Sequence, residues 1–225
     1  MSSDAFLTPR DGEPWQPILF DMDGTLLDSA PAIIGRLHHT LTEFGVVPPA
    51  DEELRHLIGP PTRTALSTFL DPAVMDDAVS FYRSLARDEG LAGFTLFPGI
   101  ADALEQLAQA GVPLAVATSK PQGEAENIVA AFGIATSFSA VVGAEASRPN
   151  KSDVVAQALR AVETSAEDAP LMVGDRRWDI DGAAQYNVPT VLVSWGYAQE
   201  EEFSAALTRI DSPAELVSFV LRQEA

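Results

Sequence analysis

The chain has 225 residues, of which 46% are hydrophobic and 21% are charged. This composition is typical of a globular protein with a sizeable core, and it excludes collagen-like, low-complexity and wholly disordered classes. The 33 acidic and 14 basic residues give a formal charge of −19, which argues against nucleic acid and membrane lipid as partners because both carry negative charge. The chain has no cysteine, so disulfides, thiolate catalysis and cysteine-ligated metals are excluded.

Two features of the sequence bear on location. No segment approaches the roughly 18 to 20 apolar residues that cross a bilayer. Residues 1–16 are polar and contain proline, and they lack the positive start and apolar centre of a signal peptide. We therefore expect residues 1–16 to form a mobile leader and the protein to be cytoplasmic.

The predicted elements begin with an apolar run at 17–20, which indicates a buried strand. Periodic segments at 31–44, 51–57, 63–70 and 73–88 predict helices separated by proline-containing turns. From residue 97 onward two kinds of element alternate. Helices are expected at 100–110, 122–132, 152–162, 180–186 and 213–222, and strands at 112–117, 140–143, 171–174 and 190–193.

This alternation predicts the fold class. Strands separated by helices form right-handed βαβ units and a parallel sheet. We expect a Rossmann-like, doubly wound α/β core made of residues 17–29 and 96–225. The block 30–95 is expected to be a second, smaller, α-helical cap domain inserted after the first strand.

Polar side chains follow the predicted strands, where ligands bind in open parallel sheets. They are Asp21 and Asp23, Thr118 to Lys120, Lys151, and Asp175 with Asp179. Alternation along an extended chain places Asp21 and Asp23 on one side, where two carboxylates do not both ionise readily. One of them is then expected to bind a metal and the other to carry a proton. Further carboxylate oxygens are the ligands that Mg²⁺ prefers, so the sequence predicts a Mg²⁺ site.

The chain contains only two lysines, Lys120 and Lys151, and both are predicted to lie in loops at strand ends. An ammonium beside a carboxylate cluster can bind phosphate and orient a nucleophile. We assign this role to Lys151 and interpret Lys120 as a surface lysine.

The motifs resemble those of the haloacid dehalogenase superfamily of Mg²⁺-dependent phosphohydrolases. The segment Asp21-Met22-Asp23-Gly24-Thr25 resembles the first motif and Ala115 to Thr118 the second. The Lys151 region resembles the third, and Gly174-Asp175 with Asp179 the fourth. The resemblance covers nearly all of the chain from Pro17 onward, and the helical insertion after the first motif is similar to that of the phosphoglycolate-phosphatase-like branch.

The resemblance implies roles for the individual residues. Asp21 would be the nucleophile that forms an aspartyl-phosphate, and Asp23 would protonate the leaving alcohol and then activate water. Thr118 and Lys151 would bind the transferring phosphoryl group. Asp175 would bind Mg²⁺ together with Asp21 and the backbone carbonyl of Asp23, supported by Asp179, which is equally interpretable as a helix cap.

Other candidates for phosphate or substrate binding are Gly24, Thr25 and Ser119 from the first two motifs, Arg63 at the start of a cap helix, and Arg148. Arg148 is a candidate because family members often carry Lys-Pro at the third motif, whereas this chain has Arg148-Pro149-Asn150-Lys151. We prefer Lys151 for the motif position. Arg176, Arg177 and Trp178 are expected to be exposed, and Asp28 and Ser29 are expected to cap the helix that follows them.

The leading hypothesis is a phosphatase that hydrolyses the phosphate monoester of a small metabolite, such as phosphoglycolate, a nucleotide or a sugar phosphate. The alternatives are a phosphomutase of a sugar phosphate, an inorganic pyrophosphatase, and, from another class, a phospho-acceptor signalling module. Phosphonate hydrolysis is discounted because residues 30–95 contain no lysine, and dehalogenation because Asp23 is present. A monomer and a homodimer are both compatible with the sequence.

Overall fold

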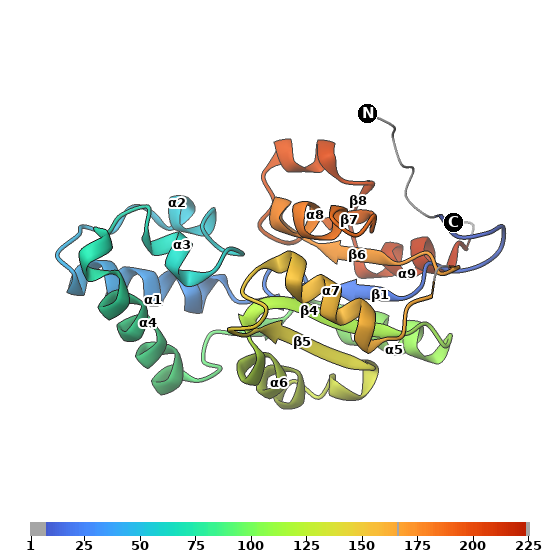
Figure 1. The fold of residues 1–225 in the computed structure, drawn as a ribbon, viewed down its shortest axis with the longest axis horizontal. Helices are drawn as coiled ribbons and strands as arrows, with labels where there is room; N and C mark the ends of the chain where they lie inside the picture. Colours follow the sequence, from blue (N-terminus) through green and yellow to red (C-terminus); the bar gives the residue numbers. More distant parts are fainter. Residues whose placement is uncertain (1–7, 166, 224–225) are drawn as a thin grey trace.

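A six-stranded parallel sheet forms the centre of the computed structural model, which describes residues 8–165 and 167–223 (Figure 1). Its strands lie in the order β5–β4–β1–β6–β7–β8. They are β1 (Ile18–Phe20), β4 (Leu114–Pro121), β5 (Ala140–Ala144), β6 (Leu171–Gly174), β7 (Thr190–Val193) and β8 (Thr208–Ile210). The chain places β4 and β5 on one side of β1 and then β6 to β8 on the other, so the Rossmann-like α/β core is confirmed.

Helices cover both faces of the sheet because side chains alternate along each strand. Ile18 and Phe20 belong to one buried cluster with α5 (Ile100–Gln109), α6 (Gln122–Ala131) and α9 (Pro213–Leu221). Leu19, between them, belongs to the opposite cluster with α7 (Lys151–Ala161) and α8 (Arg177–Ala184). Each fully buried side chain of this kind contributes roughly 1.5–3 kcal/mol to folding, so the position of β1 is fixed from both faces.

Residues 30–95 form a separate group of helices beside the end of the sheet toward which the strand arrows point (Figure 1). They are α1 (Ala30–Glu43), α2 (Asp51–Arg55), α3 (Thr62–Leu66), a short 3₁₀ turn (Pro72–Val74) and α4 (Met75–Glu89). These helices pack around a second hydrophobic cluster, to which the core adds Tyr197 and which includes Leu37, Leu41, Leu54, Leu66 and Met75. The insertion therefore has its own core.

A two-stranded antiparallel ribbon joins this helical group to the sheet. Strand β2 (Leu27–Asp28) leads into α1, and β3 (Thr95–Leu96) brings the chain back, with Leu27 opposite Leu96. Strands of two residues are too short to show a periodicity, so the sequence did not predict them, and the three-residue β8 was missed for the same reason.

The prediction of a mobile leader over residues 1–16 is contradicted within the described part of the chain. Its first seven residues lie outside the described part of the chain. Trp15 is 7% exposed, its ring stacks on Phe219 at 6.0 Å between centroids, and its backbone N donates to Val220 O at 2.9 Å. Burial of a large aromatic side chain against α9 fixes this part of the chain, so the prediction of a mobile leader is wrong at Trp15.

Over residues 8–165 and 167–223, no helix is long and apolar enough to cross a membrane. The cytoplasmic location stays a prediction.

Candidate active site

The residues of the four motifs meet at the end of the central strand β1. Here the strand order reverses, because the chain adds β4 and β5 on one side of β1 and β6 to β8 on the other. Asp21 directly follows β1, and its backbone N donates to Val173 O of β6 at 2.9 Å. Asp175 directly follows β6, and Lys151 is the first residue of α7. This is the position at which ligands bind in doubly wound sheets.

Lys151 joins the first and fourth motifs. Its Nζ lies 2.7 Å from Asp21 Oδ1 and 2.6 Å from Asp179 Oδ1. All three side chains are at least nine-tenths buried. Gly182 of α8 permits this arrangement, because a Cβ at that position would lie 2.7 Å from Lys151 Cγ. The structure thus brings together the predicted nucleophile and the predicted phosphate-binding lysine.

Asp179 is not the N-cap residue of α8, but lies at the third position of that helix. Its Oδ2 accepts hydrogen bonds from the backbone N of Asp175 at 3.2 Å and of Arg176 at 3.0 Å. Its Oδ1 is the atom that pairs with Lys151. Asp179 therefore holds both the loop after β6 and the lysine, so its carboxylate caps the start of α8 and also belongs to the acidic site.

Burial governs the acid–base properties of this cluster. Burial raises the pKa of Asp21 to about 7, against the effect of Lys151 and with a further increase from Asp179. Burial, Asp179 and Asp21 raise the pKa of Asp175 well above its usual range. Burial alone would lower the pKa of Lys151, but the carboxylates of Asp179 and Asp21 outweigh it and raise that pKa. When ionised, the carboxylates of Asp21, Asp175 and Asp179 carry more negative charge than the single ammonium group of Lys151 can neutralise.

The donor set fits a hard divalent cation. Carboxylate oxygens of Asp21, Asp175 and Asp179 lie within 4.8 Å of one another. Asp175 Oδ2 accepts a hydrogen bond from Tyr197 N at 2.7 Å, while its buried Oδ1 has no hydrogen-bond partner among the described residues. Gly24, at φ +79°, allows Asp175 to approach, because a Cβ there would lie 2.0 Å from Asp175 Oδ2. An unpaired oxygen within a carboxylate group is a suitable ligand for Mg²⁺.

Asp23 lies outside this carboxylate group and has a lysine of its own. Lys120 Nζ is 3.0 Å from Asp23 Oδ2 and 3.6 Å from Glu124 Oε1, and its side chain is 9% exposed. The interpretation of Lys120 as a surface lysine is therefore wrong. The sequence contained a signal in its favour, since one of only two lysines follows the second motif directly.

The reason for this placement is the length of β4. The strand continues to Pro121, beyond the predicted end at residue 117, because Pro121 pairs with Ala144 of β5 after a register shift. Thr118, 1% exposed, and Lys120 are therefore held on extended backbone, and Lys120 N donates to Thr118 Oγ1 at 3.3 Å. The backbone of a paired strand is held by hydrogen bonds, so the direction of its side chains is more restricted than in a surface loop.

Two predicted arginines have other partners. Arg148 donates to Gly143 O and Gln122 Oε1, both at 2.7 Å, and pairs with Glu145. Its guanidinium thus holds the loop after β5, and a role for it in phosphate binding is not supported. Arg63 is exposed and pairs with Asp76, another surface residue of the cap.

The remaining motif residues stay predictions as ligand contacts. Thr25 is fully buried, its Oγ1 has no partner among the described residues, and its carbonyl accepts from Trp195 Nε1 at 3.0 Å. Ser119 is half-buried beside Thr118 on β4.

Arg176 connects the core to the helical insertion. Its Nη1 donates to Ile58 O at 2.6 Å and to His56 O at 3.1 Å, and its Nε pairs with Glu202 at 3.2 Å. At 6% exposed it is buried, so the prediction of an exposed Arg176 is wrong, whereas Trp178 is 44% exposed as predicted. The guanidinium is held by backbone carbonyls of the loop after α2. These carbonyls are distant in sequence, so the contact could not be predicted from the sequence.

Tyr197 makes a second connection. Its hydroxyl accepts from the backbone N of Ser29 at 2.8 Å and of Ala30 at 2.9 Å, and donates to Asp28 Oδ1 at 2.9 Å. The start of α1 is thus satisfied by a distant tyrosine, while the Ser29 side chain makes no capping bond. The same residue donates its backbone N to Asp175.

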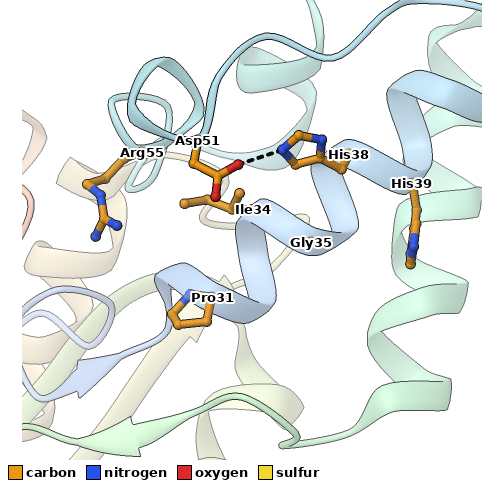
Figure 2. A pocket seen from close by; sticks show the side chains of 7 residues that line it. All are labelled: Pro31, Ile34, Gly35, His38, His39, Asp51 and Arg55. Carbon is orange, nitrogen blue, oxygen red and sulfur yellow. Dashed lines mark hydrogen bonds and ion pairs between the residues drawn. The ribbon is translucent and has the colours of Figure 1, made fainter.

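A cavity of about 400 Å³ lies elsewhere, between α1 and α2 (Figure 2). In it His38 Nε2 lies 2.8 Å from Asp51 Oδ1, and His39 points away from that pair (Figure 2). Its lining consists of Pro31, Ile34, Gly35, His38, His39, Asp51 and Arg55. It therefore contains no residue of the four motifs.

The family follows from comparison with known proteins. The model of the haloacid dehalogenase-like hydrolases matches residues 18–193, which contain all four motifs and the insertion. The chain belongs to this family. The predicted recognition of the superfamily, its phosphoglycolate-phosphatase-like branch and the prediction of an enzyme are confirmed.

Several known proteins are similar to this chain over most of its length. The tyrosine-protein kinase PtkA of Mycobacterium tuberculosis is 38% identical over 201 residues, which are 88% of this chain and 69% of that protein. A 5′-nucleotidase of Pseudomonas aeruginosa is 36% identical, covering 84% and 86% of the two chains. A phosphoglycolate phosphatase of Caulobacter vibrioides is 33% identical, covering 81% of each.

Among solved structures, a predicted phosphatase from Clostridium acetobutylicum superposes with a TM-score of 0.86 at 30% identity. The match covers 93% of this chain and the whole of that one. The likeness therefore extends over both the sheet and the helical insertion.

Proposed function

We propose that this protein is a Mg²⁺-dependent phosphatase that hydrolyses the phosphate monoester of a small metabolite through an aspartyl-phosphate on Asp21. The observation that carries the proposal is the buried group of Asp21, Lys151 and Asp175, in which one carboxylate oxygen of Asp175 has no partner among the described residues. Phosphate monoesters are among the least reactive biological esters, so their hydrolysis needs concentrated charge of this kind.

Asp21 acts as the nucleophile. One of its carboxylate oxygens forms a bond to phosphorus while the bond from phosphorus to the leaving oxygen breaks. Lys151, held by Asp21 and Asp179, and Thr118 stabilise the negative charge on the transferring group. When bound, Mg²⁺ supplies positive charge that holds Asp21 ionised and shields the phosphate oxygens. Asp21, Asp175 and the backbone carbonyl of Asp23 would hold the ion, with support from Asp179.

Asp23 handles the proton. In the first step its carboxyl group gives a proton to the leaving oxygen. In the second step it takes a proton from the water that attacks the phosphorus, and the bond from phosphorus to the Asp21 oxygen breaks, which releases phosphate. The acid in the first step thus becomes the base in the second, and the enzyme is restored.

The helical insertion, residues 30–95, serves as the cap. Its contact through Arg176 to the carbonyls of His56 and Ile58 holds it over the core. A closed cap excludes water and selects the substrate. The 5′-nucleotidase and phosphoglycolate phosphatase relatives support a small phosphorylated metabolite as partner. A phosphomutase of a sugar phosphate and an inorganic pyrophosphatase remain the alternatives.

The experiment measures phosphate release from phosphoglycolate, nucleoside monophosphates, sugar phosphates and pyrophosphate, with Mg²⁺ and with a chelator. We expect one substrate to have much the highest kcat/KM and to require Mg²⁺. Asp21→Asn should abolish release, whereas Asp181→Asn, which changes an exposed carboxylate on α8 that pairs with Arg177, should not. A sugar phosphate that is isomerised while retaining its phosphate would identify a mutase. Unchanged release by Asp21→Asn would refute the mechanism.

A further inference from the structure

Lys120 holds one oxygen of the Asp23 carboxylate and leaves the other free. Its Nζ lies 3.0 Å from Asp23 Oδ2. Asp23 Oδ1 is buried and has no hydrogen-bond partner among the described residues. The two oxygens of this carboxylate are therefore in different surroundings.

Lys120 is itself restrained on several sides. Its backbone belongs to β4, and Glu124 on α6 lies 3.6 Å from its Nζ. The Nζ also lies 5.0 Å from the centre of the Phe94 ring, within the range of a cation–π contact. The guanidinium carbon of Arg36 in α1 lies 5.3 Å from the centre of the same ring. This contact helps to hold Phe94, which lies on the segment that returns from the cap to the core. These contacts make Lys120 a rigid donor.

The chemistry of an ammonium group adds a constraint. A lysine ammonium has three donors and no acceptor. The positive ammonium group stabilises negative charge on Asp23 Oδ2, the oxygen that it contacts, so a proton carried by Asp23 is favoured on Oδ1. Lys120 thereby determines which oxygen of Asp23 exchanges protons.

We infer that Lys120 is a positioning residue for the leaving-group step: it anchors Asp23 Oδ2 so that Oδ1 carries the proton to the leaving oxygen. This inference rests on the proposed function. In the first step the O–H bond at Oδ1 breaks, a new O–H bond forms on the leaving oxygen, and the bond from phosphorus to that oxygen breaks. Lys120 contacts Asp23 and need not touch the phosphoryl group.

A positioning role for Lys120 makes the effect of its loss depend on the leaving group, which a purely structural role would not do. An alkyl phosphate needs its leaving oxygen protonated, whereas 4-nitrophenyl phosphate has a leaving group that is stable as an anion. Positioned general acids contribute about 10²- to 10⁴-fold to rates. Loss of Lys120 should therefore affect the first class of ester far more than the second.

The experiment compares kcat/KM for the best alkyl ester of the panel with that for 4-nitrophenyl phosphate. This parameter reports the steps up to departure of the leaving group. Lys120→Met should lose about 100-fold on the alkyl ester and less than about fivefold on the nitrophenyl ester. Lys120→Arg, which restores a donor-only cation, should recover part of the alkyl ester activity. Glu126→Gln, which changes an exposed carboxylate on α6 that accepts a hydrogen bond from Gln122, is the matched control and should keep the wild-type ratio.

A double-mutant cycle completes the test. Asp23→Asn should show the same preference for the nitrophenyl ester, and adding Lys120→Met to it should lower the alkyl ester rate by no more than about twofold further. Equal losses on both esters, or a full additional loss in the Asp23→Asn background, would overturn the inference. Partial unfolding of a variant lowers both rates together and leaves their ratio unchanged, so the ratio remains decisive.

The outcomes also separate this inference from the proposed function. A wild-type protein that releases no phosphate from any ester refutes both. An active wild type, with Asp23→Asn selective for the nitrophenyl ester and Lys120→Met not selective, refutes only the role of Lys120.

Discussion

The two aspartates of the first motif lie two residues apart but in different kinds of surroundings. Asp21 is surrounded by groups from the sheet and its covering helices, namely Lys151, Asp175 and Asp179. Asp23 is paired with Lys120, which in turn contacts Phe94 on the segment returning from the cap. The first environment belongs to the core alone, and the second is shared with the cap.

This difference matches the chemistry proposed for each side. The phosphoryl group that is transferred is the same in every phosphate ester. The side chains that bind it can therefore be held in one fixed arrangement at the edge of the sheet. The leaving group differs from one substrate to the next, and its side of the site lies where the segment returning from the cap contacts Lys120. We therefore expect substitutions on the two sides to have separable effects.

The largest effect is expected for Lys151→Met. Removal of the ammonium that pairs with Asp21 should lower kcat/KM by about 10³-fold, because it stabilises charge on the transferring group. The loss should be equal for alkyl and nitrophenyl esters, in contrast to Lys120→Met. A loss confined to alkyl esters would show that the two lysines do not have separate roles.

The carboxylate group on the Asp21 side predicts a pH-dependent stability. Burial raises the pKa of Asp21 from 3.8 to about 7, so the folded state retains a proton that the unfolded state loses. Without divalent cations this destabilisation is absent below about pH 4 and complete above about pH 7, and Tm should fall by several degrees over that interval.

Mg²⁺ should counteract this loss. Melting curves at pH 5 and pH 8, with and without the ion, should show a larger increase in Tm at pH 8, where the carboxylates are ionised. Asp175→Asn should reduce that increase. An increase that is independent of pH and of Asp175 would mean that the ion binds elsewhere.

A smaller effect is expected for Arg176→Met, which removes the hydrogen bonds to the cap at His56 and Ile58. KM should rise about tenfold while kcat changes less, because a hydrogen-bonded charged group contributes about 1.5–3 kcal/mol and the cap then closes less readily. Arg177→Met is the control, since Arg177 is exposed. A change in kcat alone would place Arg176 in the chemical step instead.

The smallest effect is expected for Arg63→Gln. This arginine is paired with Asp76 on the surface of the cap, and exposed ion pairs contribute about 0–1 kcal/mol. Phosphatase kcat/KM should change by less than about twofold. A tenfold rise in KM would restore the interpretation of Arg63 as a substrate contact and extend the substrate site to the start of α3.

Much of the core could be predicted from the sequence because its strands and helices have clear periodicities. Asp21 follows its strand directly, so the end of an apolar run placed it on the sheet edge. Lys151 was located by its motif and is the first residue of α7, one residue before the expected start of that helix. Both positions depend on residues that are close in sequence, so short sequence patterns were sufficient to predict them.

The errors concern side chains whose partners are distant in sequence. Lys120 is directed inward because β4 continues to Pro121, and that continuation depends on pairing with Ala144. Arg176 is buried because carbonyls of the cap lie above it. Tyr197 replaces the expected cap of Ser29 from a loop 168 residues away. No periodicity within a short window contains such information.

The central position of β1 has a consequence for the order of folding. Strand β1 is near the start of the chain, but it pairs with β4 and β6, so its second neighbour begins only at Leu171. The cap helices instead pack on one another within residues 30–95, and contacts between nearby residues form faster than distant ones. During synthesis we therefore expect the cap to assemble early, while Asp21 is among the first of the site residues to be made and among the last to be enclosed.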